Sequence, residues 1–280
     1  MSEFFHAVAR YEFMQMALIT GILASIACGV VGTYVVVRRI TYIAGAIAHC
    51  VLGGMGIARY LQAVYGLDAF HPIYGALASA LVAAVIIGLV NLHAKEREDT
   101  AIGALWAIGM AVGILFISKT PGYGEDLMGY LFGNILMVSS HDLWMIGALD
   151  IVVVAVGLIF FRQLQAVCFD QEFARLRGLN VEFYYLMLLC LTALTVVLLI
   201  TVVGIIMVIA LLTLPVAIAG HLSKRLRQMM MLSIIFCAIL TSGGLAISYS
   251  PDLPAGATIV ILAGAAYLIT LIAFQLRKFG

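Results

Sequence analysis

One histidine stands within a stretch of small or apolar residues, "AGAIAHCVLGG", at positions 44–54. Imidazole is a common ligand of transition metals, and an ionisable side chain at membrane depth is a functional candidate by default because of its cost. At about 100° per residue of helix, Gly45, Gly53 and Gly56 share the face of His49 and form a smooth groove beside it. The alternative is a close packing face on which His49 hydrogen-bonds to a neighbouring carbonyl. The residues alone leave both interpretations open.

Three further positions within or between apolar segments have chemistry of interest. Asp150 lies well inside an apolar segment and is either a carboxylate on an ion pathway or an interfacial group in contact with water. Asp252 stands between two prolines in a connection, where it is a candidate for guiding cations inward or an ordinary solvated residue. Pro215 interrupts another apolar segment and frees a backbone carbonyl, which could serve a gate or only bend the helix.

The elements that must position these residues are membrane-spanning helices. The chain has 280 residues, of which 64% are hydrophobic and 10% charged, and a mean hydropathy of +1.15, which is too apolar for a soluble protein. A spanning helix needs about 20 apolar residues. The expected spans are 14–37, 43–67, 72–93, 101–118, 143–161, 183–203, 205–221, 229–249 and 255–276. This predicts an all-α polytopic membrane protein with about nine spans, or eight if the sixth and seventh, which nearly touch at Gly204, are one segment.

The distribution of basic residues predicts the orientation of these spans. Twelve of the 15 occur in five groups on alternate connections, and Lys119 is the one basic residue on the opposite connections. The groups are Arg38 and Arg39; Lys95 and Arg97; Arg162, Arg175 and Arg177; Lys224, Arg225 and Arg227; Arg277 and Lys278. Because basic residues mark cytoplasmic loops, the N-terminus is predicted outside and the C-terminus inside. The 15 basic and 14 acidic residues nearly balance, so no basic excess indicates a nucleic-acid partner.

We expect one transmembrane domain over residues 1–280, with two connections long enough to contain structure. The outer connection, 119–142, contains a Pro-Gly turn and a short apolar stretch, which predicts a short helix at the outer half of the membrane. In the inner connection, 162–182, Asp170 is placed to cap a short helix that ends at Gly178.

Stretches in order along nearly the whole chain resemble a known family. They are "YVVVRRITYIAGAIAHCVLGGMGIA" from Tyr34, "EDTAIGALWAIGMAVGILFI" from Glu98, "DLMGYLFGNIL" from Asp126, "FDQEFARLRGL" from Phe169, "TVVGIIMVIALLTLPVAIAG" from Thr201 and "SYSPDLPAGATIVI" from Ser248. Together they resemble the metal-ion (ABC-3 type) family of ATP-binding-cassette importer permeases, which serves zinc, manganese or iron. The fold of that family is similar to that of the cobalamin and siderophore importer permeases, the type II importers.

The resemblance implies a permease subunit in the bacterial cytoplasmic (inner) membrane, paired with a second permease chain of the same or a related kind. A separate ABC ATPase subunit would supply the energy, since the chain has no GxxxxGK[ST] phosphate loop and is not expected to be an enzyme by itself. An extracytoplasmic metal-binding protein would deliver the ion. "EFARLRG" resembles the coupling helix of importer permeases, which implies ATPase contact through Asp170, Glu172, Phe173, Ala174 and Gly178, with an ordinary capped loop helix as the alternative.

The resemblance also bears on the metal pathway. Many relatives have a Gly-Asp-x-x-Ser/Ala-His pattern in which Asp and His look like transient ligands; His49 matches the histidine, but Gly45 stands where the aspartate would be. A divalent metal is therefore implied as transported substrate, with no permanently bound cofactor. We expect Cys50, about 100° away on the helix, to be dispensable. The competing classes are a secondary metal-ion transporter, which would need more intramembrane carboxylates, and an intramembrane enzyme, for which no catalytic pair is visible.

Overall fold

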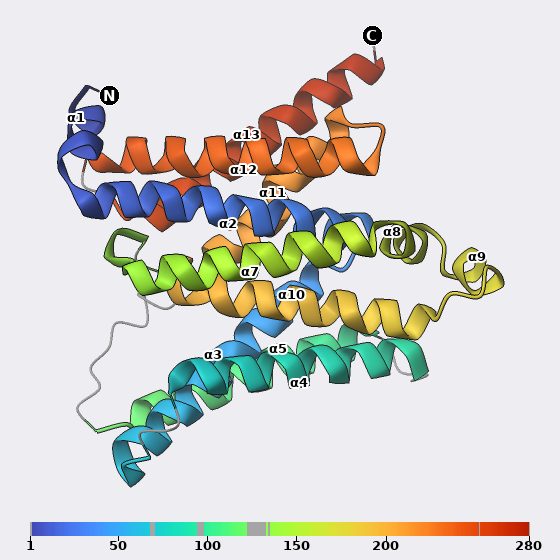
Figure 1. The fold of residues 1–280 in the computed structure, drawn as a ribbon, viewed down its shortest axis with the longest axis horizontal. Helices are drawn as coiled ribbons and strands as arrows, with labels where there is room; N and C mark the ends of the chain where they lie inside the picture. Colours follow the sequence, from blue (N-terminus) through green and yellow to red (C-terminus); the bar gives the residue numbers. More distant parts are fainter. Residues whose placement is uncertain are drawn as a thin grey trace. The chain divides into compact units, whose positions relative to one another are not determined.

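The computed structural model describes residues 2–67, 71–93, 98–121, 133, 135–251 and 253–279, and every regular element in this part of the chain is a helix. The helices are α1 (Ser2–Arg10), α2 (Glu12–Val37), α3 (Thr41–Tyr65), α4 (Pro72–His93), α5 (Glu98–Lys119), the 3-10 turn η1 (Ile135–Met137), α7 (Ser140–Ile159), α8 (Phe161–Phe169), α9 (Gln171–Leu176), α10 (Val181–Val203), α11 (Ile205–Leu222), α12 (Leu226–Tyr249) and α13 (Ala255–Phe279) (Figure 1).

Nine of the described helices are long and apolar enough to cross a membrane, which confirms the predicted all-α architecture and the larger span count. The sixth and seventh spans are separate helices, α10 and α11. Gly204 stands between them with φ 84° and ψ 159°, a backbone conformation that L side chains rarely adopt. A glycine at this single position therefore allows one apolar run to form two helices.

The contacts divide the chain into two compact units, which we describe separately. Unit 1 comprises Met1–Arg39, Met128–Phe161 and Leu198–Gly280, and unit 2 comprises Ile40–Leu127 and Arg162–Val197.

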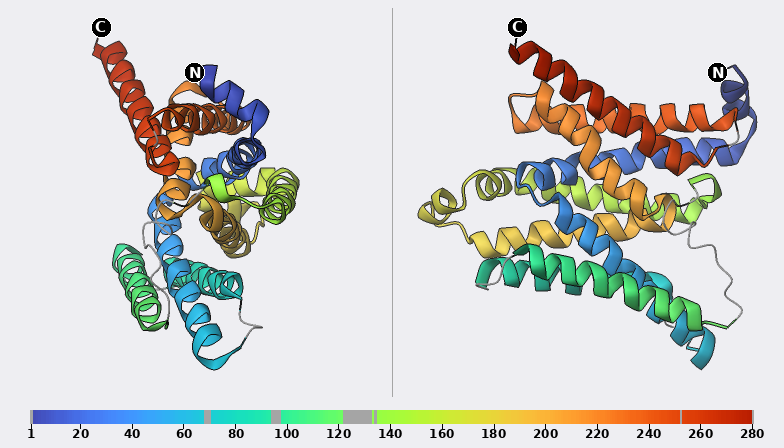
Figure 2. Two further views of the ribbon diagram at one scale, coloured as in Figure 1. Left: turned by 90° about the vertical axis from the view of Figure 1, so that its left-hand side faces the viewer. Right: turned by 180° about the vertical axis from the view of Figure 1, so that it is seen from behind.

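Unit 1 is organised around α2, which packs against α7, α11 and α12. The phenol of Tyr34 donates a hydrogen bond to the carbonyl of Gly157 on α7 at 3.0 Å. Toward α11, a Cβ at Gly32 would lie 2.6 Å from the carbonyl oxygen of Leu212, so only glycine permits this approach. Figure 2 shows α13 crossing α12 obliquely, and the apolar side chains of its second half, such as Ile269 and Leu276, are exposed.

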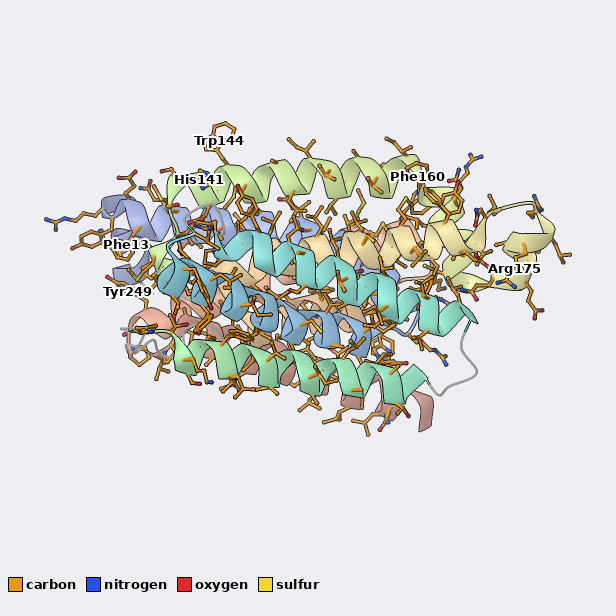
Figure 3. All side chains as sticks on the ribbon, turned by 90° about the horizontal axis from the view of Figure 1, so that it is seen from below. Phe13, His141, Trp144, Phe160, Arg175 and Tyr249 are labelled. Atoms are coloured by element: carbon orange, nitrogen blue, oxygen red, sulfur yellow. The ribbon has the colours of Figure 1, made fainter. Side chains whose placement is uncertain are left out.

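The two ends of unit 1 differ in charge. Phe13, His141 and Tyr249 lie at one end and Phe160 at the other (Figure 3). At the end of unit 1 where Phe160 lies, α2 ends and α12 begins. The basic residues at this end are Arg38, Arg39, Lys224, Arg225 and Arg227. The one-sided pattern on which the predicted orientation depends is therefore present at one end of a folded unit, while the orientation itself stays a prediction.

Pro215 lies inside α11, where its missing N–H leaves the carbonyl of Leu211 without its helical donor. The thiol of Cys237 on α12 donates to this carbonyl, with the sulfur 3.5 Å from the oxygen. A neighbouring helix thus satisfies the freed group, as expected for a proline in a spanning helix.

In unit 2, α3 packs between α4 and α5, and these three helices run side by side (Figure 1). Gly54 of α3 and Gly75 of α4 face each other so closely that neither has room for a Cβ atom. Such small residues let two helix backbones approach each other, so that the helices pack through their backbones rather than through side chains.

Two short helices were not predicted from the sequence, α1 and α8. In α8, Leu164, Val167 and Cys168 are buried while Arg162 is exposed, so the helical spacing of its apolar residues was a usable signal. The short helix expected in 119–142 falls mostly outside the described residues; within them, this connection shows the single 3-10 turn η1.

Candidate functional site

The imidazole of His49 lies on α3 in unit 2 and is 8% exposed. Its ring stacks on the indole of Trp106 from α5, with ring centroids 4.6 Å apart and an interplanar angle of 23°. The Nδ1 atom is buried and has no hydrogen-bond partner in the described part of the chain. The alternative interpretation, a packing histidine, requires a hydrogen bond to a neighbouring carbonyl, and Nδ1 makes none with the described residues. Buried polar atoms in structural roles normally have such a partner.

Gly45 lies under the same indole. A Cβ atom at this position would be 2.9 Å from Cζ3 and 3.1 Å from Cη2 of Trp106. Contacts this short require a neighbour to move, so the place of an aspartate in the family pattern is occupied by the aromatic ring.

Gly53 and Gly56 pack against the backbone of α5. Their added Cβ atoms would each lie 2.8 Å from a carbonyl oxygen, that of Gly109 and that of Gly113 respectively. The predicted groove beside His49 is therefore filled by α5 at these two positions, and the glycines bring α3 and α5 close enough for the His49–Trp106 stack.

Cys50 also faces α5. Its thiol donates to the carbonyl of Leu105, with the sulfur 3.4 Å from the oxygen, so the group next to His49 is committed to a helix contact.

Asp150 lies on the buried face of α7 in unit 1, with Ile146, Val153 and Gly157. Its side chain is 5% exposed, and neither carboxylate oxygen has a hydrogen-bond partner among the described residues. The polar groups near it include the backbone of Ala27 and the thiol of Cys28, both on α2. This burial does not fit a hydrated interfacial aspartate, which was one of the two interpretations of its sequence position.

Of the predicted site residues, all but one belong to the part of the chain that the structure describes. Asp252 lies outside the described residues. Within them, no group of three or more His, Cys, Asp and Glu side chains is close enough to hold a metal ion. His49 is thus not part of a three-residue metal site among the described residues.

The predicted helix in the inner connection is present as α9. The carboxylate of Asp170 caps it by accepting from the N–H of Phe173 at 3.0 Å, and Glu172 lies in its first turn. Its end is a Schellman motif, in which Gly178 has φ 75° and donates to the carbonyl of Arg175 at 2.9 Å. Ala174 is buried, whereas Phe173 is exposed beneath the Arg177 guanidinium at 4.9 Å.

Trp106 is the residue of this site that sequence reasoning missed. It lies within the stretch "EDTAIGALWAIG", but an aromatic side chain in an apolar helix carries no signal of its partner. The two residues lie more than fifty positions apart in the chain. Their contact depends on the register between α3 and α5, which only tertiary contacts define.

Comparison with known proteins identifies the family. The family described as "ABC 3 transport family" matches residues 10–274. The chain belongs to this family. ABC-3 members are permease subunits of ABC transporters, which places the nine candidate spans in a multi-pass protein of the bacterial cytoplasmic membrane.

Relatives cover nearly the whole chain. An uncharacterized membrane protein of Synechocystis sp. is 42% identical over 266 residues, covering 94% of this chain and 91% of that protein. The manganese transport system membrane protein MntC of Listeria monocytogenes is 35% identical, covering 95% of this ABC-3 chain and 92% of its own.

Solved structures agree with the fold. PsaBC from Streptococcus pneumoniae, in complex with Fab, superposes with a TM-score of 0.84 at 34% identity, over 96% of this chain and 94% of that one. An inward-facing metal-chelate type ABC transporter has a TM-score of 0.74 at 11% identity, over 96% of this chain and 88% of that one, and shows a likeness of fold alone.

Proposed function

We propose that this ABC-3 chain is the transmembrane permease subunit of an ATP-driven importer of a divalent transition metal, with His49 as a ligand that the ion meets in passing. The observation that carries the proposal is the buried imidazole at the position that matches the family histidine, whose Nδ1 has no hydrogen-bond partner among the described residues. A single weak donor suits transport, because a complete four-ligand cage would retain the ion.

The transported metal is one of zinc, manganese and iron. Two relatives whose names state a substrate, MntC of Listeria monocytogenes and ScaB of Streptococcus gordonii, are manganese transport proteins at 35% and 34% identity. Manganese is therefore the first ion to test, beside zinc and iron. Asp150 is left out of this proposal, because it belongs to no group of three or more His, Cys, Asp and Glu side chains among the described residues.

The partners proposed for the chain are an ABC ATPase subunit, an extracytoplasmic metal-binding protein and a second permease chain, identical or related. The support for ATPase contact is α9, a short helix fixed by a cap at one end and a Schellman motif at the other. It exposes the apolar side chains Phe173 and Leu176, of which Leu176 is 88% exposed, and Phe169 at the end of α8 is exposed as well. A rigid helix that presents apolar side chains in water is typical of a docking element.

The proposed orientation has the N-terminus outside and α9 in the cytoplasm. Its support is the gathering of basic side chains at the Phe160 end of unit 1. In a cysteine-free background, a cysteine at exposed position 141 is expected to react with an impermeant reagent added outside intact cells. A cysteine at exposed position 224 is expected to stay unlabelled, and the reverse result would overturn the orientation.

The function is tested by reconstituting the chain with its ATPase and binding protein in lipid vesicles and measuring uptake of radioactive Mn²⁺, Zn²⁺ and Fe²⁺ with and without ATP. ATP-dependent uptake of at least one ion is expected. Phe173→Ala is expected to weaken co-purification of the ATPase, whereas Leu276→Ala, which removes an even more exposed apolar side chain from α13, is not. Metal uptake that needs no ATPase would instead indicate a secondary transporter.

A further inference from the structure

The stack between His49 and Trp106 brings together a proposed metal ligand and a residue without an assigned role. The two rings are nearly parallel, with centroids 4.6 Å apart. This contact fixes the plane of the imidazole, and with it the plane that contains the lone pair of the unprotonated ring nitrogen. Trp106 is therefore placed to orient the ligand without itself offering a donor atom.

Space for this arrangement exists because of Gly45. Its missing side chain lets the indole lie against α3, whereas a Cβ there would come within 2.9 Å of the ring. Gly103 of α5 offers a comparison, since it lies one helical turn from Trp106. A Cβ added at Gly103 would meet nothing within 4 Å. The restriction is therefore specific to the α3 side of the indole, where His49 lies.

The electronic character of the indole matters as much as its shape. When an imidazole binds a divalent ion, the ring becomes electron-poor and carries part of the positive charge. The face of an indole is electron-rich and attracts a cation, most strongly where water is excluded. His49 is 8% exposed and so is largely dry. Stacking on Trp106 therefore stabilises the metal-bound form of His49 relative to the empty form.

We infer that Trp106 is a positioning residue of the metal site, which orients the His49 imidazole and stabilises its metal-bound state in the place where Gly45 excludes a second ligand. This inference rests on the proposed function, in which His49 meets the metal. Because the indole has no formal charge, the stabilisation is weaker than that of a carboxylate, and the ion is released more readily.

The chain contains two tryptophans, and this permits a direct optical test. Trp144 is 81% exposed on α7 and projects away from its helix (Figure 3), so Trp144→Phe leaves Trp106 as the single indole reporter. The full chain carrying Trp144→Phe, in lipid nanodiscs, is titrated with Zn²⁺, an ion well suited to imidazole. A saturable change in Trp106 emission is expected, and it is expected to vanish when His49→Ala is added.

A second measurement does not use the indole as reporter. Binding of radioactive Zn²⁺ is compared among Trp106→Leu, Trp106→Phe and Gly45→Ala, with Gly103→Ala as matched control. Trp106→Leu and Gly45→Ala are expected to weaken binding by roughly 2- to 30-fold, the range of a cation–π contact. Trp106→Phe keeps a ring for the stack and is expected to stay within about twofold of the parent, as is Gly103→Ala.

The outcomes separate the two proposals. If His49→Ala abolishes Zn²⁺ binding while Trp106→Leu and Gly45→Ala leave it unchanged, the inference about Trp106 is overturned and the ligand role of His49 stands. If His49→Ala binds Zn²⁺ with the affinity of the parent, the ligand role fails and takes the inference with it. Zn²⁺ binding without any change in Trp106 emission would also overturn the inference. Should Trp106→Leu fail to fold, Gly45→Ala compared with its control Gly103→Ala still decides the question.

Discussion

His49 and Asp150 are both ionisable residues inside spanning helices, yet their surroundings differ in kind. The imidazole of His49 in unit 2 lies against an aromatic ring that tolerates or favours positive charge. The carboxyl group of Asp150 in unit 1 lies between α7 and the backbone of α2, with no partner among the described residues for either oxygen. One residue has a neighbour suited to the charge it would acquire, and the other does not.

This difference separates burial from function. Burying a polar group without a hydrogen bond costs about 1–3 kcal/mol in proteins, and a charge costs more. By the free-energy cost of burial alone, both His49 and Asp150 are therefore candidates for a functional role. What distinguishes His49 is an arrangement around it, built from Gly45 and Trp106, that has a chemical use in binding a cation. The following four predictions test this contrast.

The largest effect is expected for His49→Ala. Loss of the imidazole donor should reduce metal uptake by about tenfold or more, since even indirect ligand supports are worth 10–100-fold. Uptake of radioactive metal into vesicles and ATPase activity of the assembled complex are measured together, and the ATPase should be retained. His141→Ala, at an exposed histidine of α7, is the control. Normal uptake by His49→Ala would make this histidine a packing residue.

The second effect concerns stability rather than transport. Asp150→Leu replaces an unpartnered buried carboxyl group with an apolar side chain of similar size and should raise the free energy of unfolding by about 1–3 kcal/mol. Uptake should stay within about twofold of the parent, because Asp150 belongs to no group of three or more metal-binding side chains among the described residues. Thermal unfolding in detergent and vesicle uptake are the measurements.

The second aspartate of α7 supplies the matched control for that change. Asp142 forms a capping box with Ser139, with a 2.9 Å hydrogen bond from the Ser139 N–H, so Asp142→Leu should lower stability by about 1 kcal/mol. Opposite signs for the two variants would sharpen the contrast between a satisfied and an unsatisfied carboxylate. A loss of uptake in Asp150→Leu would show instead that Asp150 serves the ion pathway.

A smaller effect on stability is expected at the Leu211 carbonyl of unit 1, a buried polar group that does have a hydrogen-bond donor. Cys237→Ala removes the donor to the Leu211 carbonyl that Pro215 leaves free, and should destabilise the protein by about 0.5–1.5 kcal/mol. Cys237→Ser retains a donor and should recover part of this loss. Equal thermal stability of the alanine variant and the parent would indicate that the carbonyl needs no partner.

The smallest effect is expected at Cys50. Its thiol makes one long contact, 3.4 Å to the carbonyl of Leu105, and sulfur is a weak donor. Cys50→Ala should leave Zn²⁺ binding and uptake within about twofold of the parent, as expected of a residue outside the cation site. A large loss would mean that the thiol, and not the neighbouring imidazole alone, binds the ion.

Local features of this protein were determined by the sequence itself. Nine apolar runs near the length of a bilayer predict nine spans, because backbone groups in lipid must be paired within each helix. Asp170 and Gly178 predict α9 in the same way, since a cap and a positive φ depend on a few consecutive residues. Both kinds of signal need no knowledge of the rest of the chain.

Relations between distant helices were decided by the tertiary structure alone. The sequence marks Gly45 and His49 as sharing a face, but it does not show that Trp106 of α5 covers that face, or that Asp150 is sealed rather than hydrated. In lipid, every apolar face is acceptable to the solvent, so hydropathy does not specify which face meets which helix. Close packing of small residues and the rings beside them sets that register, and with it the surroundings of each ionisable group.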